Sequence, residues 1–205
     1  MTGVTIYVKK RNGRLEPLIM DKVNKCAERA CEGLSDVSAS EVVLDAHVQL
    51  YNKIPTNDID KALIFSARSK IEKEPNYAFV AARLLANTIY KEVFGEGVDH
   101  HGFELQYRKA FIVNLKKLVR ADRVDPRLLD FDLKRLADAL IIDNDMRFKY
   151  LGLQTLYDRY FIHINGNRME TPQAFWMRVA MGLSLNEPDR EAAAIEFYNA
   201  VSNFQ

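Results

Sequence analysis

The stretch VTIYVKKRNGRLEPLIMDK, Val4 to Lys22, decides the fold of the N-terminal part of this chain. Its apolar residues Val4, Ile6 and Val8 occupy alternate positions, which is the period of a half-buried strand. Asn12-Gly13 follows, a dipeptide typical of tight hairpin turns because both residues tolerate positive φ. The pattern therefore predicts that the chain begins with a β-hairpin.

A helix is expected directly after this hairpin. Arg14 to Pro17 reads as the returning strand, and Asp21 as the N-cap of a helix that starts at Lys22. The segment is basic: its cations are Lys9, Lys10, Arg11, Arg14, Lys22 and Lys25, against the acids Glu16 and Asp21. Such a hairpin suits a polyphosphate, since side-chain cations stand beside amides that the helix leaves unpaired. The alternative is a solvated basic hairpin that binds nothing.

Composition and charge narrow the classes of protein to consider. The 205 residues can bury a sizeable core, and 48% apolar with 28% charged residues is an ordinary globular composition. A net charge of +1 argues against general nucleic-acid binding. No apolar run approaches the roughly 20 residues of a membrane span, and no signal-peptide pattern is present.

The cysteines indicate a reducing compartment. Cys26 and Cys31 are the only two, and their spacing on one expected helix fits neither a disulfide framework nor a zinc motif. We therefore expect buried, reduced thiols in a cytoplasmic protein.

Helical periodicity continues as far as residue 95. Four helices are expected, from Lys22 to Glu32-Gly33, from Ser38 to Leu50, from Thr56 to Ile71 and from Asn76 to Phe94. Ser38 and Glu41 form a capping box, Thr56 is a good N-cap, and Ile54-Pro55 is a break between helices. A hairpin with four helices makes a complete small α+β domain.

The glycine-rich stretch from Gly95 to Gly102 is the clearest boundary in the sequence. It predicts domains at residues 1–95 and 96–205. His100 and His101 lie within it, and because the rings of adjacent residues diverge, we interpret them as exposed linker residues rather than metal ligands.

The second part is expected to be mostly helical. Asn165-Gly166 indicates a short hairpin, and Thr171-Pro172 an N-cap followed by proline at the first helical position. The last helix carries no stop signal before Gln205, which suggests that the polypeptide was cut from something longer.

No catalytic motif is present. The sequence lacks nucleophile-elbow, P-loop, dinucleotide-binding and zinc-protease patterns. Asp143-Asn144-Asp145 is acidic but lacks the glycine and the closing glutamate of a calcium loop, so we interpret it as a loop with N-capping acids. The sequence predicts a binding protein, with no catalytic residue and no resident metal site.

Several of these stretches together resemble one family. The segments Val8 to Gly13, Glu16 to Lys22, Ile54 to Ile59 and Tyr77 to Leu84 are similar to the ATP-cone at the N-terminus of ribonucleotide reductase catalytic subunits. The later segments Tyr150 to Leu156, Glu170 to Phe175 and Ile195 to Asn199 resemble the helical region that follows the cone in the large (alpha) subunit of class I enzymes.

The resemblance implies an allosteric on/off site, where ATP permits activity and dATP suppresses it. The positions that match the family's effector site are Lys10, Glu16, Pro17, Leu18, Ile19, Met20, Asp21, Lys22, Thr56 and Lys91. Lys10, Lys22 and Lys91 would neutralise phosphates, with Mg²⁺ bridging them. Thr56 would offer a hydroxyl, and Leu18 to Met20 would line the base.

The resemblance also implies what this chain lacks and what it works with. The family's catalytic residues belong to a ten-stranded barrel expected beyond Gln205, so the chain alone should not reduce ribonucleotides. Expected partners are the rest of the large subunit, the radical-generating small (beta) subunit and further large subunits, with no nucleic acid and no membrane. The alternatives are a stand-alone nucleotide-sensing transcriptional regulator and an interaction domain with a degenerate cone.

Overall fold

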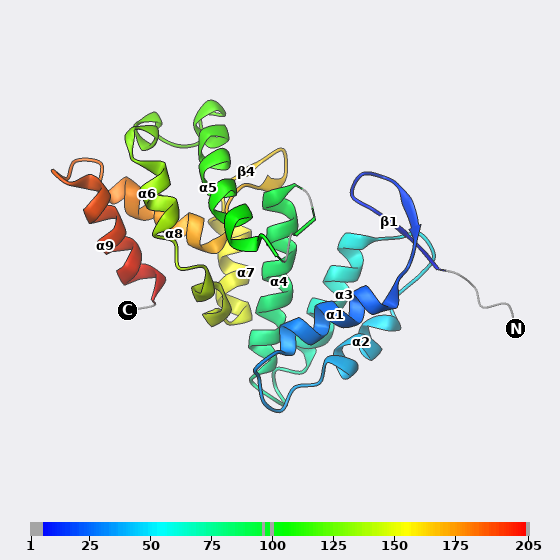
Figure 1. Cartoon of the computed structure of the whole chain (residues 1–205). Coiled ribbons are helices and arrows are strands. Elements are labelled where there is room, and N and C mark those ends of the chain that lie inside the picture. Colours follow the sequence, from blue (N-terminus) through cyan, green and yellow to red (C-terminus); the bar gives the residue numbers. More distant parts are fainter. Residues whose placement is uncertain (1–5, 96, 99–100, 204–205) are drawn as a thin grey trace, which may run out of the picture. The chain divides into compact units, whose positions relative to one another are not determined.

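The computed structural model describes residues 6–95, 97–98 and 101–203 (Figure 1). The chain forms two compact units: Met1–Thr88 with Phe148–Gln154, and Ile89–Arg147 with Thr155–Gln205. In the described residues, no helix is both long enough and apolar enough to cross a membrane. The domain boundary after residue 95 stays a prediction, and Glu96, Asp99 and His100 within that stretch lie outside the described residues.

The first unit opens with the predicted hairpin. Strand β1 (Tyr7–Lys9) pairs antiparallel with β2 (Leu15–Pro17). A third strand that the sequence did not predict, β3 (Ile54–Pro55), pairs parallel with β1 on its other side, so the sheet order is β2-β1-β3. Ile54-Pro55, interpreted as a simple break between helices, therefore belongs to the sheet.

Four helices complete the first unit: α1 (Met20–Cys31), α2 (Ala39–His47), α3 (Thr56–Ser69) and the first part of α4 (Tyr77–Phe94). They bury one face each around Val8 and Ile54 of the sheet, and the core includes Val42, Leu63 and Val80. In Figure 1 the hairpin leads directly into α1. This mainly helical architecture after an N-terminal hairpin confirms the predicted fold class.

The predicted capping box is present in an extended form. The Ser38 hydroxyl accepts a hydrogen bond from the Glu41 N–H at 3.2 Å, as predicted. The Ser38 N–H does not reach the Glu41 carboxylate directly; it donates to the Tyr77 hydroxyl at 3.0 Å, which in turn donates to Glu41 at 3.4 Å. A tyrosine from α4 thus ties the start of α2 to the core of the unit.

The second unit contains the rest of α4 and most of the later elements. These are α5 (Phe103–Arg120), the 3₁₀ helix η1 (Pro126–Asp130), α6 (Leu133–Asp138), the 3₁₀ helix η2 (Ile142–Arg147), the later part of α7 (Tyr150–Arg159), the hairpin of β4 (His163–Ile164) and β5 (Asn167–Arg168), α8 (Pro172–Leu183) and α9 (Arg190–Ser202). Helix α8 packs extensively on α9, and α5 packs on α6.

Local signals placed two of these elements correctly. Asn165 and Gly166 form the turn between β4 and β5, both with positive φ, at 51° and 81°. Thr171 is the N-cap of α8, and Pro172 is its first helical residue. The interpretation of Asp143-Asn144-Asp145 as a loop was wrong, because these residues lie in η2, and Asn144 and Asp145 are buried.

Candidate functional site

The hairpin tip gathers basic side chains around a tight turn. The Gly13 N–H donates to the Lys10 carbonyl at 2.9 Å, and the Lys10 N–H donates to the Arg14 carbonyl at 2.8 Å. Gly13 has a φ of 83°, a left-handed conformation that glycine adopts without steric cost. The glycine of the predicted Asn-Gly pair is therefore required by the turn, which presents Lys10, Arg11 and Arg14 together.

The parallel ladder sets this basic hairpin beside the start of α3. Lys9 is paired with Pro55, and Thr56 follows as the first residue of the helix. The prediction of Thr56 as N-cap was wrong, because Pro55 holds that position with extended backbone angles. No side chain caps this helix within the described residues, so its first N–H groups keep their capacity for an anion.

A contact between the hairpin turn and α3 was not predicted. The Arg11 Nε donates to the Asn57 Oδ1 at 2.9 Å, which holds the guanidinium group at the first turn of α3. The two residues lie 46 positions apart. Only the basic composition of the hairpin pointed to Arg11, and nothing in the sequence pointed to Asn57 as its partner.

The charges of the hairpin are weakly matched within the protein. Lys10 Nζ lies 4.0 Å from Glu16 Oε2, and about half of each side chain is exposed. An ion pair at this distance in water contributes little to stability. Lys10 is therefore able to bind an incoming anion without breaking a strong internal contact.

Residues 17–22 carry the chain from β2 into α1. The Leu18 N–H donates to the Ile6 carbonyl at 2.8 Å, and the side chains of Leu18 and Met20 pack against the core of the unit. Ile19, in contrast, is 49% exposed. Of the three residues predicted to line a base, only Ile19 is exposed; Leu18 and Met20 are partly buried.

Helix α1 begins earlier than predicted. Its first residue is Met20 and its N-cap is Ile19, so the assignment of Asp21 as N-cap was wrong. Asp21 instead lies in the first turn, where it pairs with Lys25 at 2.8 Å. A carboxylate in the first turn still complements the helix dipole, which explains why a cap-like residue stands there. The hydrogen bond and charge of Asp21 raise the pKa of Lys25.

The predicted residues do not all lie in one unit. Lys10, Glu16 to Lys22 and Thr56 lie in the first unit, whereas Lys91 lies on the part of α4 that belongs to the second unit. The part that Lys91 plays in the site stays a prediction.

The two cysteines are half-buried on α1, and neither forms a disulfide. The Cys26 sulfur accepts a hydrogen bond from the Asn87 amide at 3.4 Å. Burial raises the pKa of Cys31, which keeps it a protonated thiol at neutral pH. Both are therefore packing residues of the first unit.

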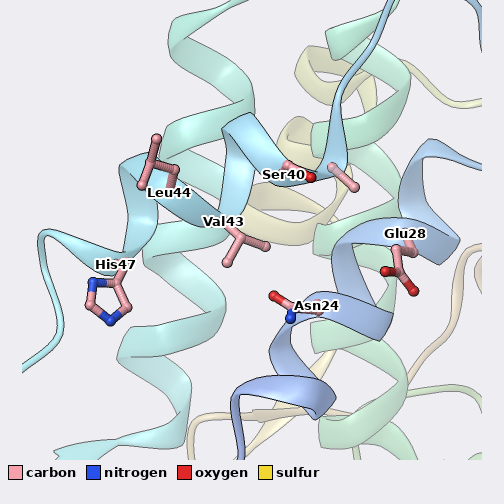
Figure 2. A pocket seen from close by; sticks show the side chains of 7 residues that line it. Asn24, Glu28, Ser40, Val43, Leu44 and His47 are labelled. Carbon is pink, nitrogen blue, oxygen red and sulfur yellow. The ribbon is translucent and has the colours of Figure 1, made fainter.

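A shallow hollow lies on another face of the first unit, between α1 and α2. Its volume is about 440 Å³. It is lined by Asn24, Glu28, Ala39, Ser40, Val43, Leu44 and His47. Figure 2 shows Val43 pointing from α2 toward Asn24 on α1. None of the residues predicted to bind a nucleotide lines this hollow.

Comparison with known proteins gives two domain matches. Residues 6–92 match the ATP cone domain, and residues 146–205 match the ribonucleotide reductase all-alpha domain. The first match covers the whole sheet and the uncapped start of α3, so it includes the basic site described above.

Relatives extend the similarity over almost the whole chain. The ribonucleoside-diphosphate reductase subunit alpha of Chlamydia muridarum is 43% identical over 98% of this chain and 19% of its own length. The corresponding subunits of Helicobacter pylori strain 26695 and Escherichia coli are 38% and 31% identical, over 98% of this chain and 25% and 26% of their own lengths. The chain thus spans about a quarter or less of the curated relatives it matches.

The two domain matches and the relatives, which are similar over 98% of the chain, identify the same family. We conclude that the chain belongs to the ribonucleotide reductase large-subunit family, with its ATP cone and its all-alpha domain.

Proposed function

We propose that this chain is the allosteric overall-activity module of a ribonucleoside-diphosphate reductase, and that its cone binds ATP and dATP as effectors. The observation that carries the proposal is the position of the basic hairpin within the region matching the ATP cone domain. Lys9 of β1 pairs with Pro55 of β3, and Arg11 of the following turn contacts Asn57 at the uncapped start of α3.

The chemistry of this region fits a nucleoside triphosphate. Lys10 and Lys22 supply positive charge for the phosphates, and Lys91 joins them in our assignment. The first amides of α3 and the Thr56 hydroxyl supply directed donors, which suit phosphate oxygens better than charge alone. Mg²⁺ would accompany the nucleotide and would neutralise part of the phosphate charge.

We assign the contacts with the base and the ribose to the segment that leads into α1. In our assignment Glu16 to Asp21 borders the nucleotide, with Ile19 exposed and Leu18 and Met20 packed against the core. ATP and dATP differ by one ribose hydroxyl. Control by this pair therefore requires that the hydroxyl change how the cone packs in the complete assembly.

The wider role follows from the same assignment. The reductase makes deoxyribonucleotides for DNA synthesis, and the module would report their abundance to the rest of the large subunit. The partners in this proposal are that remainder, the radical-generating small subunit and further large subunits. We propose that dATP shifts the complete enzyme to an inactive oligomer of different size, measurable by light scattering.

Isothermal titration of the chain with ATP and with dATP, each with Mg²⁺, tests the binding step. Lys10→Ala removes a charge-assisted contact and should weaken binding of both nucleotides about tenfold or more, from about 1.5–3 kcal/mol of lost interaction. Lys73→Ala is the matched control, since Lys73 is exposed in the same unit and outside the site. Unchanged affinity in folded Lys10→Ala would overturn the pocket, and no binding by the natural sequence would identify a degenerate cone.

A further inference from the structure

The second unit buries a carboxylate that the proposed effector site does not use. Asp145 lies on η2 and is 2% exposed. Its Oδ2 accepts hydrogen bonds from the Tyr90 hydroxyl at 2.7 Å and the Tyr107 hydroxyl at 2.8 Å. Its Oδ1 accepts one from the Gln173 Nε2 at 2.8 Å. Three helices, α4, α5 and α8, thus each direct one donor at a single side chain.

The backbone N–H groups of Ile141 and Gln173 set the direction of the hydrogen bonds that lead to Asp145. The Ile141 N–H donates to the Tyr198 hydroxyl at 2.7 Å, so that hydroxyl turns its proton to the Gln173 Oε1 at 2.8 Å. The Gln173 amide must then present its Nε2 to Asp145. The Gln173 N–H donates to the Tyr107 hydroxyl at 3.1 Å, which leaves the proton of Tyr107 for Asp145.

This arrangement matches a carboxylate and not a carboxylic acid. Among the described residues, every group hydrogen-bonded to Asp145 is a donor. An ionised carboxylate accepts all of them, whereas a protonated one carries a donor of its own. An added proton must therefore displace one of the three, or reverse it, at a place with little access to water.

Burial opposes the charged form that the donors favour. The net pKa of Asp145 is about 6. Burial raises it, and the hydrogen bonds from Gln173, Tyr90 and Tyr107 lower it by a smaller amount. The titratable groups around it are Tyr90 on α4, Tyr107 on α5, Tyr198 on α9 and Asp143 on η2 itself; α8 contributes the neutral Gln173. The negative charge of Asp143 also raises the pKa of Asp145. Burial raises the pKa of Tyr90 and Tyr107 well above 10, so both stay protonated donors.

We propose that Asp145 is a proton-controlled lock within the second unit. Its carboxylate holds Tyr90, Tyr107 and Gln173, and uptake of a proton breaks one of these hydrogen bonds while the carboxyl group stays buried. The lock shares no residue with the proposed nucleotide site, although Lys91 of that site follows Tyr90 on α4. It makes the packing of η2 against α4, α5 and α8 respond to mildly acidic pH.

Two backbone amides report on the state of the lock. The Gln173 N–H donates to the Tyr107 hydroxyl, and the Ile141 N–H donates to the Tyr198 hydroxyl. When a proton on Asp145 rearranges the tyrosine and glutamine bonds, these amides should lose protection from hydrogen exchange. An amide outside the cluster, such as Leu18 in the hairpin of the first unit, should not.

The test is an NMR titration of the ¹³C-labelled carboxyl groups from pH 4.5 to 8, with amide exchange measured over the same range and corrected for intrinsic rates. The carboxyl signal absent from Asp145→Asn belongs to Asp145, and we expect its midpoint near 6. The Gln173 amide should exchange about tenfold faster below this midpoint, the effect of losing one hydrogen bond. Asp145→Asn, which imitates the neutral acid, should show that faster exchange at pH 7.5. Asp143→Asn removes a charge that raises the pKa of Asp145, so it should lower the midpoint and keep the slow exchange of the natural sequence at pH 7.5.

A midpoint below pH 4.5, or exchange at Gln173 that is constant across the midpoint, overturns the proposal. If Asp145→Asn does not fold, Tyr107→Phe replaces it. Removal of one donor from the carboxylate should raise the midpoint by about one unit. The control, Tyr160→Phe, alters an exposed tyrosine and should leave it in place. An unmoved midpoint in Tyr107→Phe also overturns the lock.

Discussion

The two units of this chain treat their polar groups in opposite ways. In the first unit Ser66 is the buried polar side chain among the described residues, and the charges of the hairpin face solvent with weak partners. In the second unit the buried polar side chains are Asn114, Asn144, Asp145, Glu170, Thr171, Gln173, Ser184 and Ser202. Exposed charges stay hydrated and need no partner within the protein, whereas burial of a polar group costs free energy unless a hydrogen bond compensates it.

This difference predicts how substitutions should affect binding and stability in each unit. Loss of a charge from the hairpin should change binding and leave stability nearly unchanged. Loss of a buried partner in the second unit should change stability strongly, because the groups left behind have no water to replace it. Four substitutions or conditions test this contrast, in order of decreasing effect.

Asp145→Ala should have the largest effect. It leaves the hydroxyls of Tyr90 and Tyr107 and the amide of Gln173 without their buried acceptor, and we expect a loss of about 3–5 kcal/mol in the free energy of unfolding. Urea denaturation followed by circular dichroism measures it. Asp143→Ala, on the same 3₁₀ helix but exposed, should cost less than about 0.5 kcal/mol. Equal losses in the two variants would contradict the contrast between the units.

The carboxyl group of Asp145 should also make the free energy of unfolding depend on pH. Its pKa rises from 3.8 in the unfolded chain to about 6 in the folded one. Between these values the folded chain holds a proton that the unfolded chain does not, so the free energy of unfolding falls as pH rises from about 4 to 6. Over this range the contribution of Asp145 to the free energy of unfolding falls by about 3 kcal/mol, and it changes no further at higher pH.

Denaturation at several pH values between 4.5 and 7.5 measures this slope. Other groups titrate as well, so the informative quantity is the difference between the natural sequence and Asp145→Asn, which lacks the group. A difference that is flat across this range would show that Asp145 has an ordinary pKa. No substitution in the hairpin should alter the slope.

Arg83→Met tests the polar contacts of the first unit. Arg83 Nη1 donates to the carbonyls of Ala30 at 3.2 Å and Glu32 at 2.6 Å, and so satisfies the end of α1. The methionine keeps an apolar stem but leaves these carbonyls to water. We expect a loss of about 1–2 kcal/mol, smaller than at Asp145 because this site is partly open. Lys73→Met, at an exposed position, is the control for thermal melting.

Ser38→Ala should have the smallest effect. It removes the acceptor for the Glu41 N–H at the start of α2 and should cost about 1 kcal/mol. The Tyr77 hydroxyl still receives the Ser38 backbone N–H, which the alanine retains. Ser40→Ala, two residues further on and without a capping role, should be neutral in the same melting experiment. A loss above about 2 kcal/mol would show that α2 depends on its cap more than on its packing.

The region of the hairpin shows which structural features could be predicted from the sequence. The alternating apolar residues, the Asn12-Gly13 turn and the basic cluster were all legible, because each depends on residues within a few positions of one another. The helix starts at Asp21 and Thr56 were misplaced, since a cap-like side chain can also serve in the first turn. Strand β3 was missed because Ile54-Pro55 is too short to show any period, and its pairing with β1 is a long-range contact.

By itself, the sequence determined the elements whose signals are local: the hairpins, the four helices of the first part, the N-cap positions Ser38 and Thr171, and a basic segment suited to phosphate. Only the tertiary structure decided which distant groups meet. The pairing of Arg11 with Asn57 and the burial of Asp145 under Tyr90, Tyr107 and Gln173 join residues 28 to 55 positions apart, for which no local pattern exists. An aspartate in a short acidic run has the same local signature whether it faces water or not. Its environment, and with it its chemistry, is set by the helices that close around it.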